Sequence, residues 1–406
     1  MIQNVIVIIA VLIAGAILFS KRLQKSKTWR ATVTPLASII GSGFLVAAPL
    51  MADNVGDYAI FVMATLIVLA YFVGSAIRFN IRYLEPILAQ RNNQSVIHTF
   101  SEISQITLTV AYFISVAYYL NLLSAFLLNG MGISSHFTAD CITTGILLLI
   151  GFLGWIRGLS IFENIEKYAV GVNFAMIGGL LLGLLYFNFN SFLDGEWRLL
   201  THEPNINLNT FRVLLGLLIV VQGFETSRFL GAEYSAELRI KTMKKAQIIS
   251  GIIYLVFIVL ITELFRNLQG TAGVTGIIQV SGIIALILPV CLTISAVGSQ
   301  FSAAIADTAG AGGLIGEVSR KRIKIKYAYP LIALVAIAIT WGANVYTIIC
   351  YASRAFALFY AFQCLLAFFV AFQSPKNKHR FVRLLLFGFL FILCLMAVIF
   401  GLSSEG

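Results

Sequence analysis

Two apolar stretches with glycines at their middle decide the fold of this chain. The first is Thr34-Pro-Leu-Ala-Ser-Ile-Ile-Gly-Ser-Gly-Phe-Leu-Val-Ala-Ala-Pro49, and the second is Val220-Val-Gln-Gly-Phe-Glu-Thr-Ser-Arg228. A glycine costs about 1 kcal/mol relative to alanine inside a helix. At the depth of a bilayer, opened backbone is tolerated only where it is buried in protein or lines a cavity. Both stretches are therefore predicted to be broken helices near the middle of a membrane.

The composition requires lipid as the solvent. Hydrophobic residues make up 59% of the 406 residues and charged residues 11%, whereas a soluble domain carries about 25% charged residues. A membrane-spanning helix needs about 20 mainly apolar residues. We therefore predict an all-α membrane protein with about twelve spans, at 3–20, 32–51, 58–78, 100–128, 138–156, 163–187, 208–231, 244–265, 280–307, 327–341, 344–371 and 382–402.

The basic residues predict the orientation of these spans. Cytoplasmic loops carry an excess of Lys and Arg, and 23 of the 28 basic residues lie in alternating segments, namely 21–30, 78–97, 157–167, 236–245, 320–326 and 376–383. Both termini are then predicted to be extracytoplasmic. The net charge of +11 reflects this orientation and contact with anionic lipid headgroups, so it implies no nucleic-acid partner. A compact core of this kind suits a bacterial inner (cell) membrane.

The spans divide into two sets of five that follow an extra leading span. Because five is odd, the second set crosses the membrane in the opposite sense to the first, as in an inverted-topology repeat. The predicted parts are a leading helix with its basic loop (1–30), a first repeat (31–187), an extracellular loop (188–207), a second repeat (208–371) and a C-terminal helix (372–406).

The motifs in these repeats resemble the amino acid–polyamine–organocation (APC) superfamily. The resemblance rests on Ile39-Ile-Gly-Ser-Gly-Phe-Leu45, on Gly223-Phe-Glu225 with the basic stretch that follows, and on Ser299-Gln-Phe-Ser302 before a glycine-rich exit at 310–316. It covers roughly residues 30–371 and implies the leucine-transporter (LeuT) fold, a 5+5 inverted-repeat helical bundle. The leading span departs from the family pattern.

The resemblance also implies a substrate site between the two glycine stretches. Gly41, Ser42 and Gly43 would present amides and a hydroxyl to a substrate carboxylate. Gln222, Gly223 and Phe224 would supply carbonyls and an aromatic lid, and Tyr112, Tyr118 or Tyr119 would line the cavity with a ring. The alternative for the glycines is close helix packing of the small-xxx-small kind.

Glu225, Arg354 and Asp307 are among the charged residues inside predicted spans, where charge is costly and usually functional. Glu225 is interpreted as a proton carrier, as a counter-ion for a cationic substrate, or as the partner of Arg228 or Arg354 in a structural pair. The partner of Arg354 is Glu225, a substrate carboxylate or the carbonyls of a broken helix. Asp307 is a proton relay or a solvated residue of an inner vestibule.

Three serines suggest a coupling-ion site. Ser299 and Ser302 resemble the hydroxyl ligands of sodium-coupled carriers, and they would face backbone carbonyls near Ser38. Serines in membrane helices also bond their own i−4 carbonyl, which is the structural alternative.

These observations predict a secondary active transporter. We expect a cation-coupled amino acid permease that works by alternating access, with a proton favoured over sodium because Glu225 and Asp307 can titrate. The alternatives are a carrier of a metal ion, nucleobase or osmolyte, or a non-transporting sensor or scaffold. The four histidines and five cysteines have no metal-ligand or catalytic spacing. We therefore expect no enzyme activity, no cofactor and no bound metal.

Overall fold

The computed structural model of the chain describes residues 2–89, 96–133, 135–159, 163–197, 208–268, 275–319, 322–373 and 379–402. The elements in these ranges are α-helices and short 3₁₀ helices. They are α1 (Ile2–Leu18), α2 (Lys21–Gln24), α3 (Lys27–Asn54), η1 (Gly56–Tyr58), α4 (Ala59–Ala89), α5 (Val96–Gly130), α6 (His136–Arg157), α7 (Glu163–Leu193), α8 (Leu208–Gly216), η3 (Leu217–Val221), α9 (Thr226–Phe229), η4 (Leu230–Ala232), α10 (Ala236–Ile261), η5 (Thr262–Leu264), α11 (Phe265–Leu268), α12 (Gly276–Ile284), α13 (Leu288–Val318), α14 (Ile325–Gly342), α15 (Val345–Gln373) and α16 (Arg380–Phe400).

The helical membrane fold predicted from composition is confirmed. Within the described residues, ten helices are long and apolar enough to cross a membrane. The predicted leading span is the shorter α1, with 17 residues, and the predicted span 208–231 is divided among α8, η3 and α9. The count of about twelve spans therefore stays a prediction.

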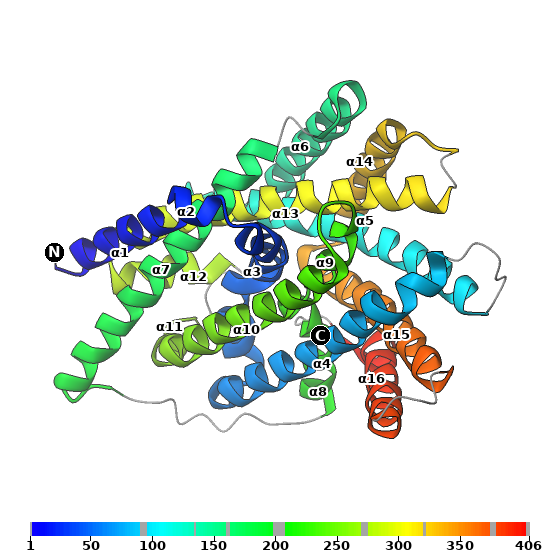
Figure 1. Ribbon diagram of the computed structural model, residues 1–406. Coiled ribbons are helices and arrows are strands. Elements are labelled where there is room, and N and C mark those ends of the chain that lie inside the picture. Colours follow the sequence, from blue (N-terminus) through cyan, green and yellow to red (C-terminus); the bar gives the residue numbers. More distant parts are fainter. Residues whose placement is uncertain are drawn as a thin grey trace.

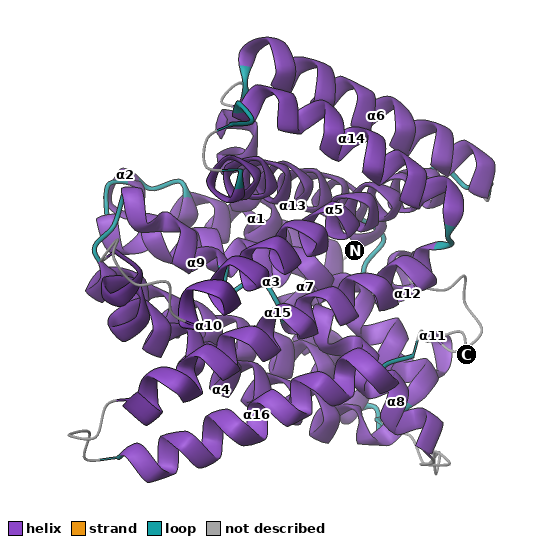
Figure 2. Cartoon of the chain, turned by 90° about the vertical axis from the view of Figure 1, so that its right-hand side faces the viewer, coloured by secondary structure: helices purple, strands orange, loops and turns teal. Residues whose placement is uncertain are grey.

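The two predicted repeats interlock through their equivalent helices. The first span of the first repeat, α3, packs against η3 in the first span of the second repeat. The next three pairs of equivalent helices are also in contact, namely α4 with α10, α5 with α13 and α6 with α14. Figures 1 and 2 both show α6 and α14 side by side at one edge of the molecule, above the long α5 and α13. This pairing is the arrangement expected of an inverted repeat. The boundaries of the repeats stay predictions.

Only the second of the two predicted helix breaks is present. Between η3 and α9 the chain leaves the helix at Gln222 and Gly223, and Gly223 has φ = +115°, a conformation that favours glycine. The predicted break at 41–43 is wrong, because α3 runs without interruption from Lys27 to Asn54. The glycines there serve close packing, which offsets their cost in a helix.

The predicted span 280–307 is also corrected. It consists of two helices, α12 and α13, which join through Ala285 and the following turn, and α13 begins with Pro289 in its first turn. Proline is favoured there because the first helical N–H groups have no intrahelical partner. The glycine-rich exit at 310–316 is likewise helical, and Gly310 gives room to the ring of Tyr112, whose Cε2 would lie 2.9 Å from an added Cβ.

The leading helix α1 packs against α7 at the outside of the bundle (Figure 1). Glycines of α7 make room for its side chains. A Cβ on Gly179 would lie 2.6 Å from Val11, and one on Gly171 would lie 2.6 Å from Phe19. Small residues at helix contacts let membrane helices approach closely. The leading span is therefore part of the folded bundle.

Candidate functional site

The break after η3 lies directly against α3. A Cβ on Gly223 would come within 2.6 Å of the carbonyl carbon of Ser38, and a Cβ on Gly43 within 2.7 Å of the Cα of Val220. Contacts under 3.0 Å are essentially never made by real Cβ atoms, so both positions require glycine. The two glycine stretches of the sequence therefore meet. They touch as packed backbone in this structure, so a solute between them requires α3 and the break to separate.

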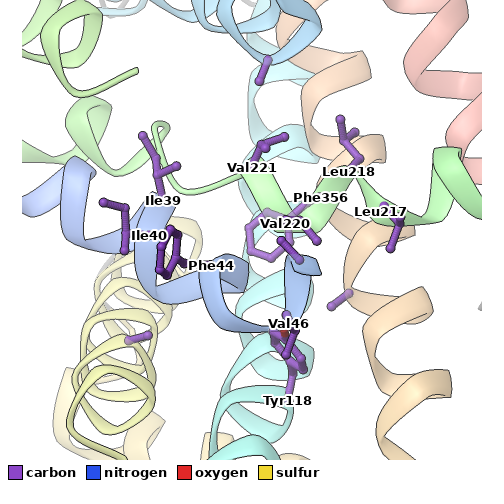
Figure 3. Close-up of a cluster of buried hydrophobic side chains, with 14 of the residues drawn as sticks. Ile39, Ile40, Phe44, Val46, Tyr118, Leu217, Leu218, Val220, Val221 and Phe356 are labelled. Carbon is purple, nitrogen blue, oxygen red and sulfur yellow. The ribbon is translucent and has the colours of Figure 1, made fainter. Parts of the chain in front are cut away.

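A tyrosine of α10 joins the two segments. The hydroxyl of Tyr254 lies 3.0 Å from the carbonyl oxygen of Ile39 on α3 and 2.7 Å from that of Val220 on η3. Figure 3 shows the apolar side of this contact, where Phe44 of α3 and Val220 of η3 lie in one cluster with Phe356 of α15. The approach of α3 to the break is thus fixed by both apolar packing and a shared hydroxyl.

Glu225 is the buried acid at the break. Its side chain is 1% exposed. The carboxylate oxygen Oε2 accepts hydrogen bonds from the backbone N–H of Gly223, at 3.0 Å, and from the Tyr360 hydroxyl of α15, at 2.7 Å. The ring of Tyr360 also stacks on Phe224, with ring centres 5.1 Å apart and planes 14° apart. Among the described residues Glu225 makes no ion pair, so its charge is balanced by hydrogen bonds alone.

The predicted structural ion pairs of Glu225 are wrong. Arg228 donates from Nη1 to the side-chain oxygen of Gln363 on α15. Arg354 donates from Nε to the carbonyl oxygen of Gly401, at 3.0 Å, beyond the end of α16. Both guanidinium groups meet neutral carbonyl oxygens, so neither neutralises Glu225. The partner of Arg354 is a backbone carbonyl, although that carbonyl does not belong to a broken helix.

Asp307 is buried between α13 and α5. It is 3% exposed, and its carboxylate accepts a hydrogen bond from the hydroxyl of Ser115. The alternative of a solvated residue in an inner vestibule is wrong for this structure, because the side chain is buried and meets Ser115 of α5. Its role as a proton relay stays a prediction. Asp307 and Glu225 interact electrostatically, and Tyr112 interacts with both.

One of the predicted sodium ligands, Ser299, is bound to an amide side chain. Ser299 accepts a hydrogen bond from Nδ2 of Asn173, at 3.0 Å, while Ser295 donates to Oδ1 of the same residue, at 2.6 Å. The nearby carbonyl of Gly41 accepts from Nε2 of Gln300, at 3.1 Å. N–H donors thus occupy positions where a cation would need oxygen atoms. Ser302 is buried, and Ser38 contacts the break instead.

The other predicted substrate residues lie in the same region but make contacts of their own. Nε2 of Gln222 donates to the hydroxyl of Tyr119, at 2.9 Å. Tyr112 packs edge-on against Phe356, with ring centres 6.0 Å apart. Gly41 faces α13, where an added Cβ would lie 3.3 Å from Oγ of Ser299. The side chain of Ser42 lies outside the described residues.

Several polar residues of this region were not predicted, namely Ser115, Asn173, Tyr254, Gln300, Tyr360 and Gln363. Each lies inside a long apolar helix. A polar side chain at membrane depth must find a partner, and this is the signal that could have identified them. Their partners lie in other helices, so one sequence could not show which of them meet.

A cavity of about 760 Å³ opens at the end of the bundle opposite the basic loops. It is lined by the ends of α5, α6, α14 and α15 and includes polar side chains of each, such as Asn121, Asp140, Thr340 and Tyr346. The break and Glu225 do not line it. In the predicted orientation this cavity faces the outside.

The chain matches known transporters over almost its whole length. A family model described as APC superfamily transporter matches residues 21–401. An uncharacterized protein of Aquifex aeolicus (strain VF5) is 43% identical over 388 residues, which cover 94% of this chain and 93% of that protein.

Solved structures agree in fold. A manganese transporter of Eremococcus coleocola, in complex with an aromatic bis-isothiourea substituted compound, superposes with a TM-score of 0.59 at 13% identity and covers 93% of this chain and 88% of its own. A histidine-to-alanine mutant of that transporter gives 0.58 at 14% identity, with 92% and 87% covered. At these identities the likeness concerns the fold alone. The chain is therefore an integral membrane protein that belongs to the APC superfamily of transporters and has a LeuT-like fold.

Proposed function

We propose that this transporter carries a small organic solute, an amino acid or a close relative, together with protons by alternating access. The solute would bind where α3 meets the break between η3 and α9, and Glu225 would be the coupling group. The observation that carries this proposal is the environment of Glu225, which is 1% exposed and held by Gly223 and Tyr360. A buried carboxylate without a cation marks an ion or proton path in a membrane.

The chemistry of the break favours an organic solute over a metal ion. A metal carrier needs several carboxylate, thiolate or imidazole ligands at one place. The described residues contain no group of three or more His, Cys, Asp or Glu that could hold a metal ion. Backbone groups of the break and the neighbouring amide of Gln222 and ring of Phe224 suit a polar organic molecule instead. The alternative of a metal carrier rests on the fold of the manganese transporter.

The polar contacts of α13 favour protons over sodium. Asn173 and Gln300 direct N–H groups at Ser299 and at the carbonyl of Gly41, and N–H donors repel a metal cation. Two buried carboxyl groups, Glu225 and Asp307, can bind protons without such a site. We place the chain in a bacterial inner membrane, with the basic loops in the cytoplasm.

A ligand screen tests the substrate class. Purified protein would be heated with amino acids, amines, nucleobases and divalent metals at two pH values, with and without sodium. A ligand at 100 times its dissociation constant stabilises the folded state by about 2.7 kcal/mol, which raises the melting temperature. The proposal expects an amino acid response that is independent of sodium and lost in Gly223→Leu. A response to divalent metals alone would overturn it.

A further inference from the structure

The short helix α9 is held to α15 by two side-chain contacts one turn apart. Glu225 and Arg228 lie three residues apart at α9, and Tyr360 and Gln363 lie three residues apart on α15. Tyr360 donates to Glu225 at 2.7 Å, and Arg228 donates to the side-chain oxygen of Gln363. The first contact lies at the proposed site, and the second lies one turn nearer the basic end of the bundle.

Gln363 joins four helices at this place. Its side chain is fully buried. Asn80 of α4 donates to its backbone oxygen at 2.8 Å and to Oε1 at 3.0 Å, while Nε2 of Gln363 donates to Ser104 of α5 at 2.8 Å. With Arg228, every polar atom of the amide side chain has a partner. A buried amide whose oxygen and nitrogen are both hydrogen-bonded favours one arrangement of the helices around it.

A second arginine fixes α9 from the other side. Arg239 of α10 forms an ion pair with Glu85 of α4, at 2.7 Å, and also donates to the backbone oxygen of Arg228 at 2.8 Å. This pair joins α10 to α4, which pack against each other over a long contact. Arg239 thus holds α9 to α10 and α4, while Tyr360 and Gln363 hold it to α15.

We propose that Gln363 is the gating residue at the basic end of the transporter. Its contact with Arg228 closes the path from the break to that end, and it must open for the solute to leave. This inference deepens the proposed function and rests on it for the nature of the solute. The contact suits a gate because it joins a charge to a neutral amide, which is strong enough to close but weaker than an ion pair.

Two substitutions at Gln363 have opposite effects under this proposal. Gln363→Glu gives Arg228 a carboxylate partner and strengthens the closed state. Asn80 can still donate to the new carboxylate, and the hydroxyl of Ser104, which accepts from Gln363, can turn to donate to it. Gln363→Leu removes the acceptor and weakens it. Gln247→Glu is the matched control, because Gln247 also accepts from a buried arginine, Arg78, but joins α10 to α4 rather than α9 to α15.

The readout is the reactivity of a cysteine placed at Ser227. That side chain is fully buried on α9, and its hydroxyl has no hydrogen-bond partner among the described residues, so Ser227→Cys removes no hydrogen bond among them. The five native cysteines are first replaced by alanine, which leaves Gln363 in place beside the former Cys364. A membrane-impermeant maleimide is then applied from the basic side of oriented membrane vesicles.

We expect Gln363→Glu to slow the labelling of S227C about fivefold, because a carboxylate binds a guanidinium group more strongly than a neutral amide oxygen does. Gln363→Leu should speed labelling by a similar factor, and Gln247→Glu should leave it unchanged. Equal rates in all variants, or a change in the same direction for both substitutions at Gln363, would overturn the proposal. Gln363→Leu removes the acceptor of Arg228 and can impair folding, so its melting temperature is measured in parallel. If this variant does not fold, the direction of the change in labelling rate for Gln363→Glu still tests the proposal.

This assay needs no substrate, so its result is separate from the proposed function. If the two substitutions at Gln363 change the labelling rate in opposite directions but no amino acid stabilises the protein in the screen, the gate is supported and the proposed solute class is rejected. An amino acid response with unchanged labelling would retain the transporter and reject Gln363 as its gate.

Discussion

At the residue scale, the hydrogen bonds of Glu225 determine what this site can do. Its carboxylate receives a backbone N–H from Gly223 and a hydroxyl from Tyr360, both on the same oxygen. The two arginines that the sequence places within reach are held elsewhere. The acid is therefore free of a fixed counter-charge, and a proton or a cationic group can bind it without first displacing an ion-pair partner.

Removal of the Tyr360 hydroxyl tests this arrangement. We expect Tyr360→Phe to keep the stacking on Phe224 but to leave the carboxylate with one donor, at a cost of about 1 to 3 kcal/mol. The melting temperature of the purified protein should fall, and the uptake rate of the solute found in the screen should fall with it. Tyr329→Phe is the control, since that buried ring of α14 packs on Gly154 and Gly312. Equal behaviour of the two variants would contradict the role of Tyr360.

At the element scale, the interruption of the second glycine stretch is the main feature. The chain passes from η3 to α9 through Gln222 and Gly223 while α3 remains helical beside it. The two stretches look alike in sequence, yet the first uses its glycines for contact and the second uses Gly223 for a backbone conformation. The difference arises because Gly43 faces Val220 whereas Gly223 has φ = +115°.

Gly223→Ala tests this account of the break. The substitution strains the backbone by about 1 to 2 kcal/mol and places a Cβ 2.6 Å from Ser38. Gly195→Ala provides a matched control, because Gly195 also has positive φ, +70°, but nothing lies within 4 Å of its added Cβ. We expect Gly223→Ala to lower the melting temperature clearly more than Gly195→Ala. A smaller or equal effect would mean that α3 and the break are not in close contact.

The sequence predicted the helices well because apolar run length and basic loops report directly on membrane crossing. It located Glu225 and Gly223 because a carboxylate and a glycine at mid-span are unusual. It did not predict that α3 is unbroken. Helix propensity gives the free-energy cost of Gly41 and Gly43 within a helix, but it does not show the close packing against a neighbouring segment that offsets this cost. It also missed Tyr360 and Gln363, because partners 135 residues away in the chain follow only from the packed fold.

At the scale of the whole molecule, the two ends of the bundle differ. At the basic end the contact of Arg228 with Gln363 and the ion pair of Arg239 with Glu85 join α4, α9, α10 and α15. At the opposite end a cavity of about 760 Å³ opens. Alternating access requires that, in any one conformation, the transporter is closed at one end and open at the other.

The orientation of the molecule can be measured with surface labels. Lys326 and Gly132 are both exposed, at the basic end and at the opposite end respectively. In intact cells, an impermeant maleimide should label Gly132→Cys and not Lys326→Cys in a cysteine-free chain, because the basic loops face the cytoplasm. Labelling of Lys326→Cys alone would mean that the molecule is inserted the other way round.

The most direct test of the central claim is a comparison of two kinds of transport by Glu225→Gln. In proteoliposomes, the unchanged protein should accumulate the solute identified by the screen when the outside is made acidic, and it should also exchange labelled for unlabelled solute without a gradient. A neutral amide at Glu225 keeps the shape of the site but cannot carry a proton. The account predicts that Glu225→Gln retains exchange and loses accumulation. Accumulation by Glu225→Gln equal to that of the unchanged protein would contradict the role of Glu225 as the coupling group.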